Sequence, residues 1–188
     1  LIILLGIAIQ KFIFSPLKKN ELNMMVVSLG LAITFEQSSM IFWGPDDRVF
    51  PFFELGVFKI SNVFFSINRL FILGCAVILI IGLYLLIHKT KIGSAIRAVA
   101  QDQDTATLQG INPDKIFPFS FGLGCGLAAA AGTLIGPLFL VSPHMGSLPM
   151  VKAFVVIVLG GLGSIVGAVI GGVIMGIMES FVATFLGA

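Results

Sequence analysis

Long apolar segments alternate with short polar ones along this chain, and the alternation predicts membrane-crossing helices. A helix needs about 20 consecutive, mostly apolar residues to cross a bilayer. The predicted spans run over Leu22–Gly44, over Leu70–His88, from Asn112 to about Val141 with an interruption at Gly136-Pro137, and over Ile165–Leu186. Asn112 is a suitable N-cap for the third span, and Pro113 is tolerated at its first helical position.

Two apolar segments are too short to cross alone. Leu1–Gln10 is predicted to be the end of a helix that began upstream, so we expect a fragment of a longer protein, truncated at both ends. Val151–Leu159 is followed by the glycine-rich break Gly160–Ser164. It is either re-entrant or half of a broken crossing, and non-helical backbone at that depth requires surrounding protein or a water-filled cavity.

Three connecting segments are predicted to be loops. Lys11–Glu21 is basic and contains a proline, and Ser142–Met150 is rich in turn residues. Gly44–Arg69 is long, acidic near its start, and alternates apolar and polar residues around Val57–Phe65. That alternation fits either a short hairpin or an interfacial element.

The fourth polar segment, Lys89–Lys115, carries the punctuation of a small folded unit. From Gly93 the chain is expected to continue helically from the preceding span. Asp102 or Asp104 can then cap a short helix whose body is Thr105–Gln109. Gly110 suits the position just after a helix, because glycine readily adopts the left-handed conformation.

This short helix is predicted to lie across the membrane face and to present Ala106 and Leu108 to a partner, while Ile111 supplies the usual apolar contact at its end. The alternative interpretation is a solvated connector that happens to be capped.

Composition and charge make the chain a membrane protein and orient it. It is 57% hydrophobic and 11% charged over 188 residues, against about 25% charged in soluble domains. Seven of its eleven basic residues lie in two segments separated by two spans: Lys11, Lys18, Lys19, Lys89, Lys91, Arg97 and Lys115. The positive-inside rule places both segments in the cytoplasm, with Gly44–Arg69 and Ser142–Met150 outside. The predicted fold is therefore all-α and polytopic.

Glycines and polar residues inside the spans are candidates for packing or for a pathway. Helix packing is favoured by small residues spaced by four, as in Gly163, Gly167 and Gly171, and again in Gly172 and Gly176. The break itself is a candidate pathway lining through Gly160, Gly161, Gly163 and Ser164. Glu36, Gln37, Ser39 and Glu179 either form interhelical or interfacial contacts or line a polar route, because charge at membrane depth is costly.

The sequence contains no catalytic constellation, no phosphate-binding loop and no metal-ligand cluster, so we expect neither enzymatic activity nor a cofactor. Cys75 and Cys125 fall in separate apolar runs without a histidine cluster, and they are interpreted as small residues buried in the membrane.

Three stretches resemble the permease subunit of branched-chain amino acid ABC importers: GSAIRAVAQDQDTATLQGIN (Gly93–Asn112), FSFGLGCGLAAAAGTLIGP (Phe119–Pro137) and VKAFVVIVLGGLGSIVGAVIGGVIMGIMESF (Val151–Phe181). Ser15–Gln37 fits more loosely. The resemblance covers nearly the whole chain and implies a single permease domain over residues 1–188, with a cytoplasmic coupling loop over residues 89–115.

The resemblance also implies partners and roles. The partners would be a second permease subunit, ABC ATPase subunits that hydrolyse ATP, and a periplasmic or lipid-anchored binding protein, in the bacterial plasma (inner) membrane. Membrane lipid is expected as a further partner, and nucleic acid is not. The implied ATPase-coupling residues are Gly93, Arg97, Ala98, Asp102, Asp104, Ala106, Leu108, Gly110 and Ile111.

Alternative functions remain within and outside this class. A urea, amide or sugar ABC importer would have a similar permease. A passive channel or secondary transporter would need charge partners in its spans and no ATPase docking, and a purely structural subunit would leave Glu36 and the glycine break unexplained.

Overall fold

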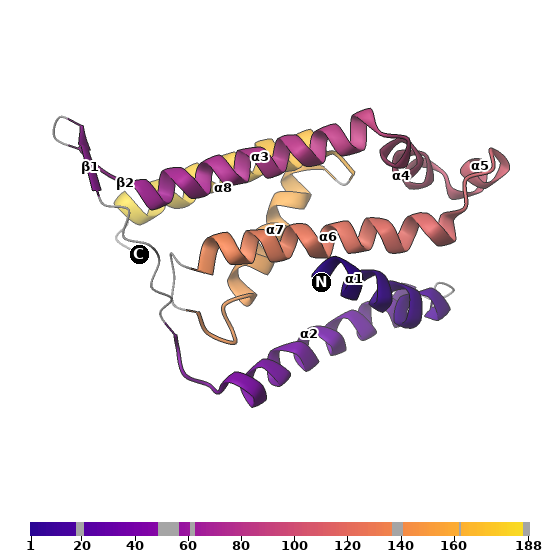
Figure 1. Ribbon diagram of the computed structural model, residues 1–188, viewed down its shortest axis with the longest axis horizontal. Helices are drawn as coiled ribbons and strands as arrows, with labels where there is room; N and C mark the ends of the chain where they lie inside the picture. The colour runs from indigo at the N-terminus through magenta and orange to yellow at the C-terminus, as the bar shows by residue number, and fades with distance from the viewer. Residues whose placement is uncertain (18–20, 49–56, 61–62, 137–140, 162, 186–188) are drawn as a thin grey trace. The chain divides into compact units, whose positions relative to one another are not determined.

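The computed structural model describes residues 1–17, 21–48, 57–60, 63–136, 141–161 and 163–185 (Figure 1). Contacts divide the chain into two compact units, Leu1–Ser142 and Pro143–Ala188.

The first unit is mainly helical. Its elements are α1 (Ile2–Ile9), the π-helix η1 (Gln10–Phe14), the 3₁₀-helix η2 (Ser15–Leu17), α2 (Glu21–Trp43), β1 (Val57–Ile60), β2 (Val63–Ser66), α3 (Ile67–Lys89), α4 (Lys91–Gln101), α5 (Gln103–Leu108) and α6 (Pro113–Ile135). The second unit is a helical hairpin of α7 (Ser147–Gly160) and α8 (Ile165–Phe185).

The four predicted spans are confirmed. In the described part of the chain, α2, α3, α6 and α8 are long and apolar enough to cross a membrane. The segment Ile2–Leu17 and helix α7 are apolar but shorter. The chain is therefore an all-α, multi-pass membrane protein, with one small hairpin between two of its spans.

The β-hairpin of β1 and β2 decides between the two interpretations of the loop after α2, a short hairpin or an interfacial element. Strands β1 and β2 pair antiparallel, with Val57 opposite Ser66 and Ile60 opposite Val63. The predicted loop over Gly44–Arg69 is too long at its end, because α3 already begins at Ile67. Gly44, with φ +86°, closes α2 as expected for a residue that ends a helix in the left-handed region.

The predicted basic loop Lys11–Glu21 is wrong over most of its length, since helical turns continue to Leu17. The reason is packing. Phe14 is buried, with 8% of its surface exposed, and its ring lies 5.5 Å from the ring of Phe121 on α6. An apolar contact with a neighbouring helix keeps the chain helical where its local composition indicates a loop.

Two further boundaries differ from prediction. The third span ends at Ile135 and does not continue to Val141, which forms an isolated antiparallel bridge with Arg48 through two 3.0 Å backbone hydrogen bonds. Pro137, within the predicted interruption, lies outside the described residues. The predicted loop Ser142–Met150 also ends early, because α7 begins at Ser147.

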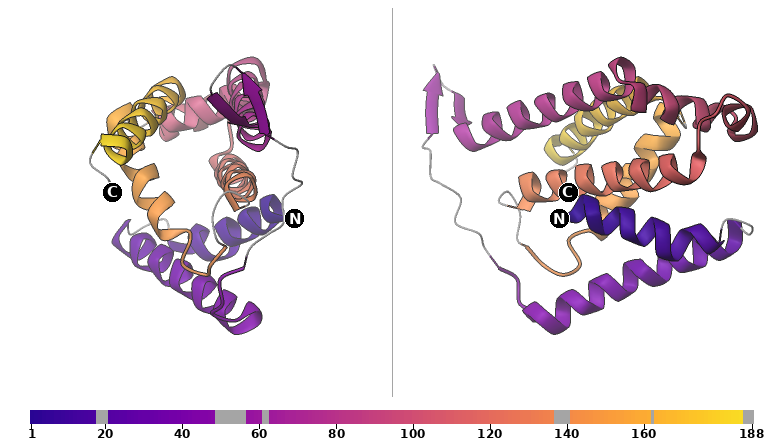
Figure 2. Two further views of the ribbon diagram at one scale, coloured as in Figure 1. Left: turned by 90° about the vertical axis from the view of Figure 1, so that its left-hand side faces the viewer. Right: turned by 45° about the vertical axis from the view of Figure 1, so that its right-hand side comes forward.

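Helices α1 and α6 contact each other through small residues (Figure 2). A Cβ placed on Gly6 would lie 2.8 Å from the Cys125 sulfur, and one placed on Gly122 would lie 2.6 Å from Cγ1 of Ile7. Cys125 is thus a packing residue at a close helix crossing.

The hairpin of α7 and α8 is held by the same kind of contact. A Cβ on Gly167 would lie 1.8 Å from the carbonyl oxygen of Gly160, and one on Gly171 would lie 3.1 Å from that of Val156. The predicted glycine packing is confirmed at Gly167 and Gly171. At Gly176 a Cβ would meet no heavy atom within 4 Å.

Gly167 and Gly176 therefore provide a matched pair of substitutions on one helix. We expect Gly176→Ala to leave the thermal unfolding midpoint of the full-length protein in detergent unchanged or slightly raised, because alanine favours a helix over glycine by about 1 kcal/mol. Gly167→Ala should lower the midpoint by several degrees, because its Cβ displaces the Gly160 backbone. Equal midpoints for the two variants would show that α7 and α8 do not meet at Gly167.

Candidate functional site

The segment between α3 and α6, residues 89–115, contains two short helices, each with its own cap. Thr90 begins α4: its backbone is extended, and its hydroxyl accepts a 3.0 Å hydrogen bond from the amide of Gly93. The expectation that Gly93 continues the preceding span helically is wrong for this reason. The chain turns at Thr90, and a Cβ on Gly93 would lie 2.3 Å from the carbonyl oxygen of Ile87.

Asp102, not Asp104, is the cap of α5. Its carboxylate accepts hydrogen bonds from the amides of Asp104 (2.9 Å) and Thr105 (3.1 Å) and from the Thr105 hydroxyl. The Thr105 hydroxyl, then the Thr105 amide and the Asp104 amide, lower the pKa of Asp102 below its ordinary value, because each donor favours the ionised carboxylate.

Helix α5 ends in a Schellman motif. The amide of Ile111 donates to the carbonyl of Ala106 (3.1 Å), and the amide of Gly110 donates to that of Thr107 (3.0 Å). Gly110 has φ +83°, as predicted for the residue after the helix. The side chain of Asn112 then caps α6 by accepting from the amide of Asp114 at 2.9 Å, with Pro113 in the first turn, which confirms the predicted start of this helix.

The two short helices pack against each other and against α6. Val99 on α4 and Ala106 on α5 are buried, with 6% and 2% of their surfaces exposed. The prediction that Ala106 faces outward is wrong, because the turn after Asp102 directs that face of α5 toward the neighbouring helices. Leu108 is 89% exposed, and it is the apolar side chain that α5 presents outward.

The remaining predicted coupling residues surround this core. Arg97 is exposed and Ala98 is partly buried on α4, while Asp102, Asp104 and Gly110 are exposed. Ile111 is partly buried. Their role in coupling stays a prediction.

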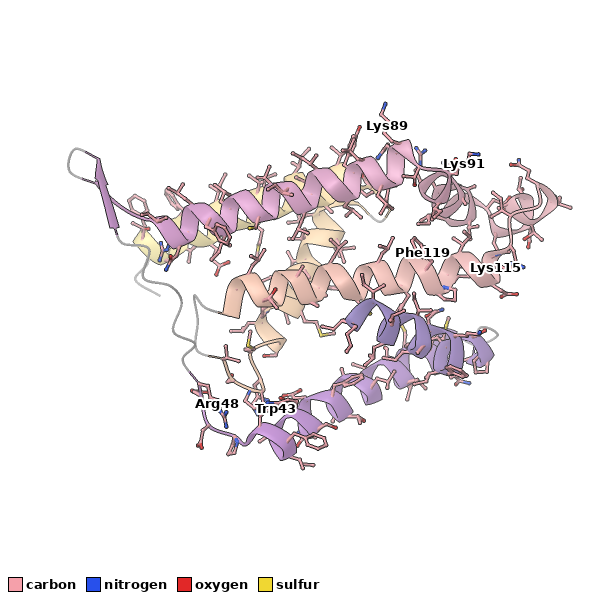
Figure 3. The ribbon with its side chains drawn as sticks, in the orientation of Figure 1. Trp43, Arg48, Lys89, Lys91, Lys115 and Phe119 are labelled. Atoms are coloured by element: carbon pink, nitrogen blue, oxygen red, sulfur yellow. The ribbon has the colours of Figure 1, made fainter. Side chains whose placement is uncertain are left out.

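Charge distinguishes the two ends of the first unit (Figure 3). Lys89, Lys91 and Lys115 gather at the end that holds α4 and α5, whereas Trp43 and Arg48 lie at the opposite end. Arg48 donates a 3.0 Å hydrogen bond to the Trp43 carbonyl there. The side of the membrane on which each end lies stays a prediction from the positive-inside rule.

The predicted pathway residues of the glycine break have local structural tasks. Gly161 and Gly163 adopt φ +85° and +89°, and the Ser164 hydroxyl accepts a 3.0 Å hydrogen bond from the Gly167 amide, which caps α8. Gly160 lies against Gly167. Gly161, Gly163 and Ser164 are exposed, and their lining of a pathway stays a prediction.

The polar residues predicted within the span Leu22–Gly44 lie on α2. Glu36 and Ser39 are partly exposed and Gln37 is exposed. The neighbouring Ser38 hydroxyl donates to the Thr34 carbonyl one turn earlier, at 2.6 Å. Whether these residues line a polar route stays a prediction.

Lys152 was missed as a functional candidate. Its ammonium forms an ion pair with the Glu179 carboxylate across α7 and α8, and the two side chains are 43% and 52% exposed. Interhelical contact, one of the two interpretations offered for Glu179, is therefore present. The available signal was the lone lysine of an otherwise apolar α7, since a charge at that depth requires a partner.

The whole chain, residues 1–188, matches the family model described as the permease component of branched-chain amino acid transport systems. The chain belongs to this family.

Relatives from bacteria and archaea agree with this assignment. The branched-chain amino acid permease BraD of Pseudomonas aeruginosa is 32% identical over 97% of this chain and 62% of its own length, and LivH of Escherichia coli is 31% identical over 96% and 61%. The probable permease LivH of Methanocaldococcus jannaschii is 36% identical over 74% and 43%. The chain thus spans about three fifths of the length of the first two relatives. No solved structure matches it significantly.

The capping carboxylate of Asp102 predicts an acid-sensitive α5. Because its folded pKa is lowered, the ionised cap stabilises α5 above the ordinary aspartate pKa of about 4, and this stabilisation is lost as pH falls through the lowered value. Hydrogen–deuterium exchange of the full-length protein, corrected for intrinsic rates, should show falling protection of residues 103–108 in acid. Asp102→Asn caps without ionising and should abolish this pH dependence; the same dependence in both proteins would contradict the assignment.

Proposed function

We propose that this chain is part of the permease subunit of an ATP-binding cassette importer that moves branched-chain or related small amino acids inward across the plasma (inner) membrane. The partners proposed are a second permease subunit, two ATPase subunits and a periplasmic or lipid-anchored binding protein. Family membership supports the permease role, and the names of the relatives support this substrate class.

One observation carries the coupling part of the proposal: the packed pair α4–α5 joins two membrane-length helices. A connector that only links spans needs no buried residues, yet Val99 and Ala106 are buried, with 6% and 2% of their surfaces exposed. Caps at Thr90, Asp102 and Asn112 fix each change of direction. A displacement of α5 would therefore displace α3 and α6 as well, because no loose loop lies between them to move instead.

Leu108 is the proposed contact with the ATPase. Its side chain is 89% exposed at the end of a helix whose other face is fixed against the protein. An exposed apolar side chain on a rigid polar segment is the kind of anchor that fills a pocket on a partner. Movement of the ATPase subunits would act on α5 through this contact and tilt α3 and α6, which alternates access to the pathway.

Replacing Leu108 with serine tests this contact. We expect Leu108→Ser to remove most ATPase subunit from the purified full-length permease and to reduce ATP-driven leucine uptake by about tenfold or more, since a truncated interface anchor typically costs 2 kcal/mol or more. Membrane insertion should be unchanged.

Ile92→Ser is the matched control, because it removes an exposed apolar side chain from α4 and leaves α5 intact. It should retain the ATPase subunit. Undiminished co-purification with Leu108→Ser would refute the docking role, and uptake of leucine without ATP would favour a passive channel or secondary transporter.

A further inference from the structure

The ion pair of Lys152 and Glu179 lies in an apolar setting. Glu179 stands 14 residues after the first residue of α8 and six before the last, so it lies in the last third of a helix of membrane-crossing length. Val151 and Met178, the chain neighbours of the pair, are 63% and 59% exposed. Charges at this depth have to face water or protein, because lipid does not solvate them.

The backbone positions of the pair are set by the glycine contacts of the hairpin. Gly160 meets Gly167, and Val156 meets Gly171, so the register of α7 against α8 is fixed before Lys152 and Glu179 are reached. The Lys152 ammonium and the Glu179 carboxylate then meet across the two helices, and both side chains remain about half exposed. One turn before Glu179, a Cβ on Gly176 would meet no heavy atom within 4 Å, so α8 is open to its surroundings there.

We propose that Lys152 and Glu179 form a recognition site inside the permease for the head group of a zwitterionic α-amino acid, an inference that rests on the proposed function. The Glu179 carboxylate binds the substrate ammonium, and the Lys152 ammonium binds the substrate carboxylate. The internal ion pair opens and is replaced by two ion pairs with the substrate.

Charge balance is the physical reason for this assignment. The site is neutral when empty, because its own charges pair, and it is neutral when loaded, because a zwitterion adds no net charge. No charge is left unpaired at membrane depth in either state. An unpaired charge there would be costly. A sugar, urea or an amide offers no full charges, so it cannot replace the lost ion pair, and the site discriminates against these solutes.

The test uses the full-length permease with its ATPase subunits in proteoliposomes, supplied with binding protein and labelled leucine. Two double variants are compared with the wild type: the neutral Lys152→Met/Glu179→Gln and the charge-exchanged Lys152→Glu/Glu179→Lys. We expect both to assemble and to hydrolyse ATP, while leucine uptake falls by about tenfold or more. The neutral variant loses its charge-assisted contacts, and the exchanged variant accepts the head group only in reverse, which turns the leucine side chain away from its wild-type position.

The two variants distinguish a substrate-recognition site from an ion pair that has only a structural role. If the pair only fastens α7 to α8 or sits beneath the second permease subunit, exchanging the charges preserves it, so wild-type uptake by the exchanged variant would overturn the proposal. Wild-type uptake by the neutral variant would do the same while leaving the proposed function intact. If the wild-type complex itself imports no leucine, both the site and the proposed function fail.

Lys11→Met and Asp47→Asn are matched controls for the loss of one charge of each sign. Both residues are exposed, and both lie outside the membrane-length helices. Uptake by each control should equal that of the wild type.

Discussion

This structure is governed by one need: every backbone N–H and C=O group that water cannot reach must have a hydrogen-bond partner in the protein. Within a bilayer only a helix meets that need within one segment, so the long apolar stretches are helical. The same need applies wherever a helix stops, because the first amides and last carbonyls have no partner. The chain meets it locally: side chains of Thr90, Asp102, Asn112 and Ser164 accept from the first amides of α4, α5, α6 and α8.

Close helix contact rather than a large apolar core holds the described chain together. In its first unit α1 meets α6 at Gly6 and Gly122, and in its second unit α7 meets α8 at Gly160 and Gly167. Lipid removes the hydrophobic advantage of burying leucine or phenylalanine, so association depends on backbones that approach closely. Most large apolar side chains are accordingly left exposed, to face lipid or partner subunits.

Besides Phe14, buried apolar side chains occur in the polar segment between α3 and α6, where Val99 and Ala106 are buried. Apolar contacts gain most from burial where water is the solvent, and this segment is polar and outside the membrane-length helices. Firm packing suits the proposed task of receiving force from an ATPase. The proposed recognition pair belongs to the other unit, where Lys152 and Glu179 extend from a hairpin that glycines hold in register. Coupling and recognition would thus rest on separately stabilised parts of the chain.

The sequence by itself determined the existence of the spans and where several helices begin and end, because these depend on local composition and on hydrogen bonds a few residues apart. It predicted the end of α5 at Gly110 and the start of α6 at Asn112, and it left the cap of α5 open between Asp102 and Asp104. Only the tertiary structure decided what depends on distant neighbours. Phe14 against Phe121 keeps the supposed basic loop helical, packing buries Ala106 and leaves Leu108 outward, and Glu179 gains Lys152, 27 residues away, as its partner. Local sequence does not identify the partner in a contact between segments far apart in the chain, so these partners had to be seen in the fold.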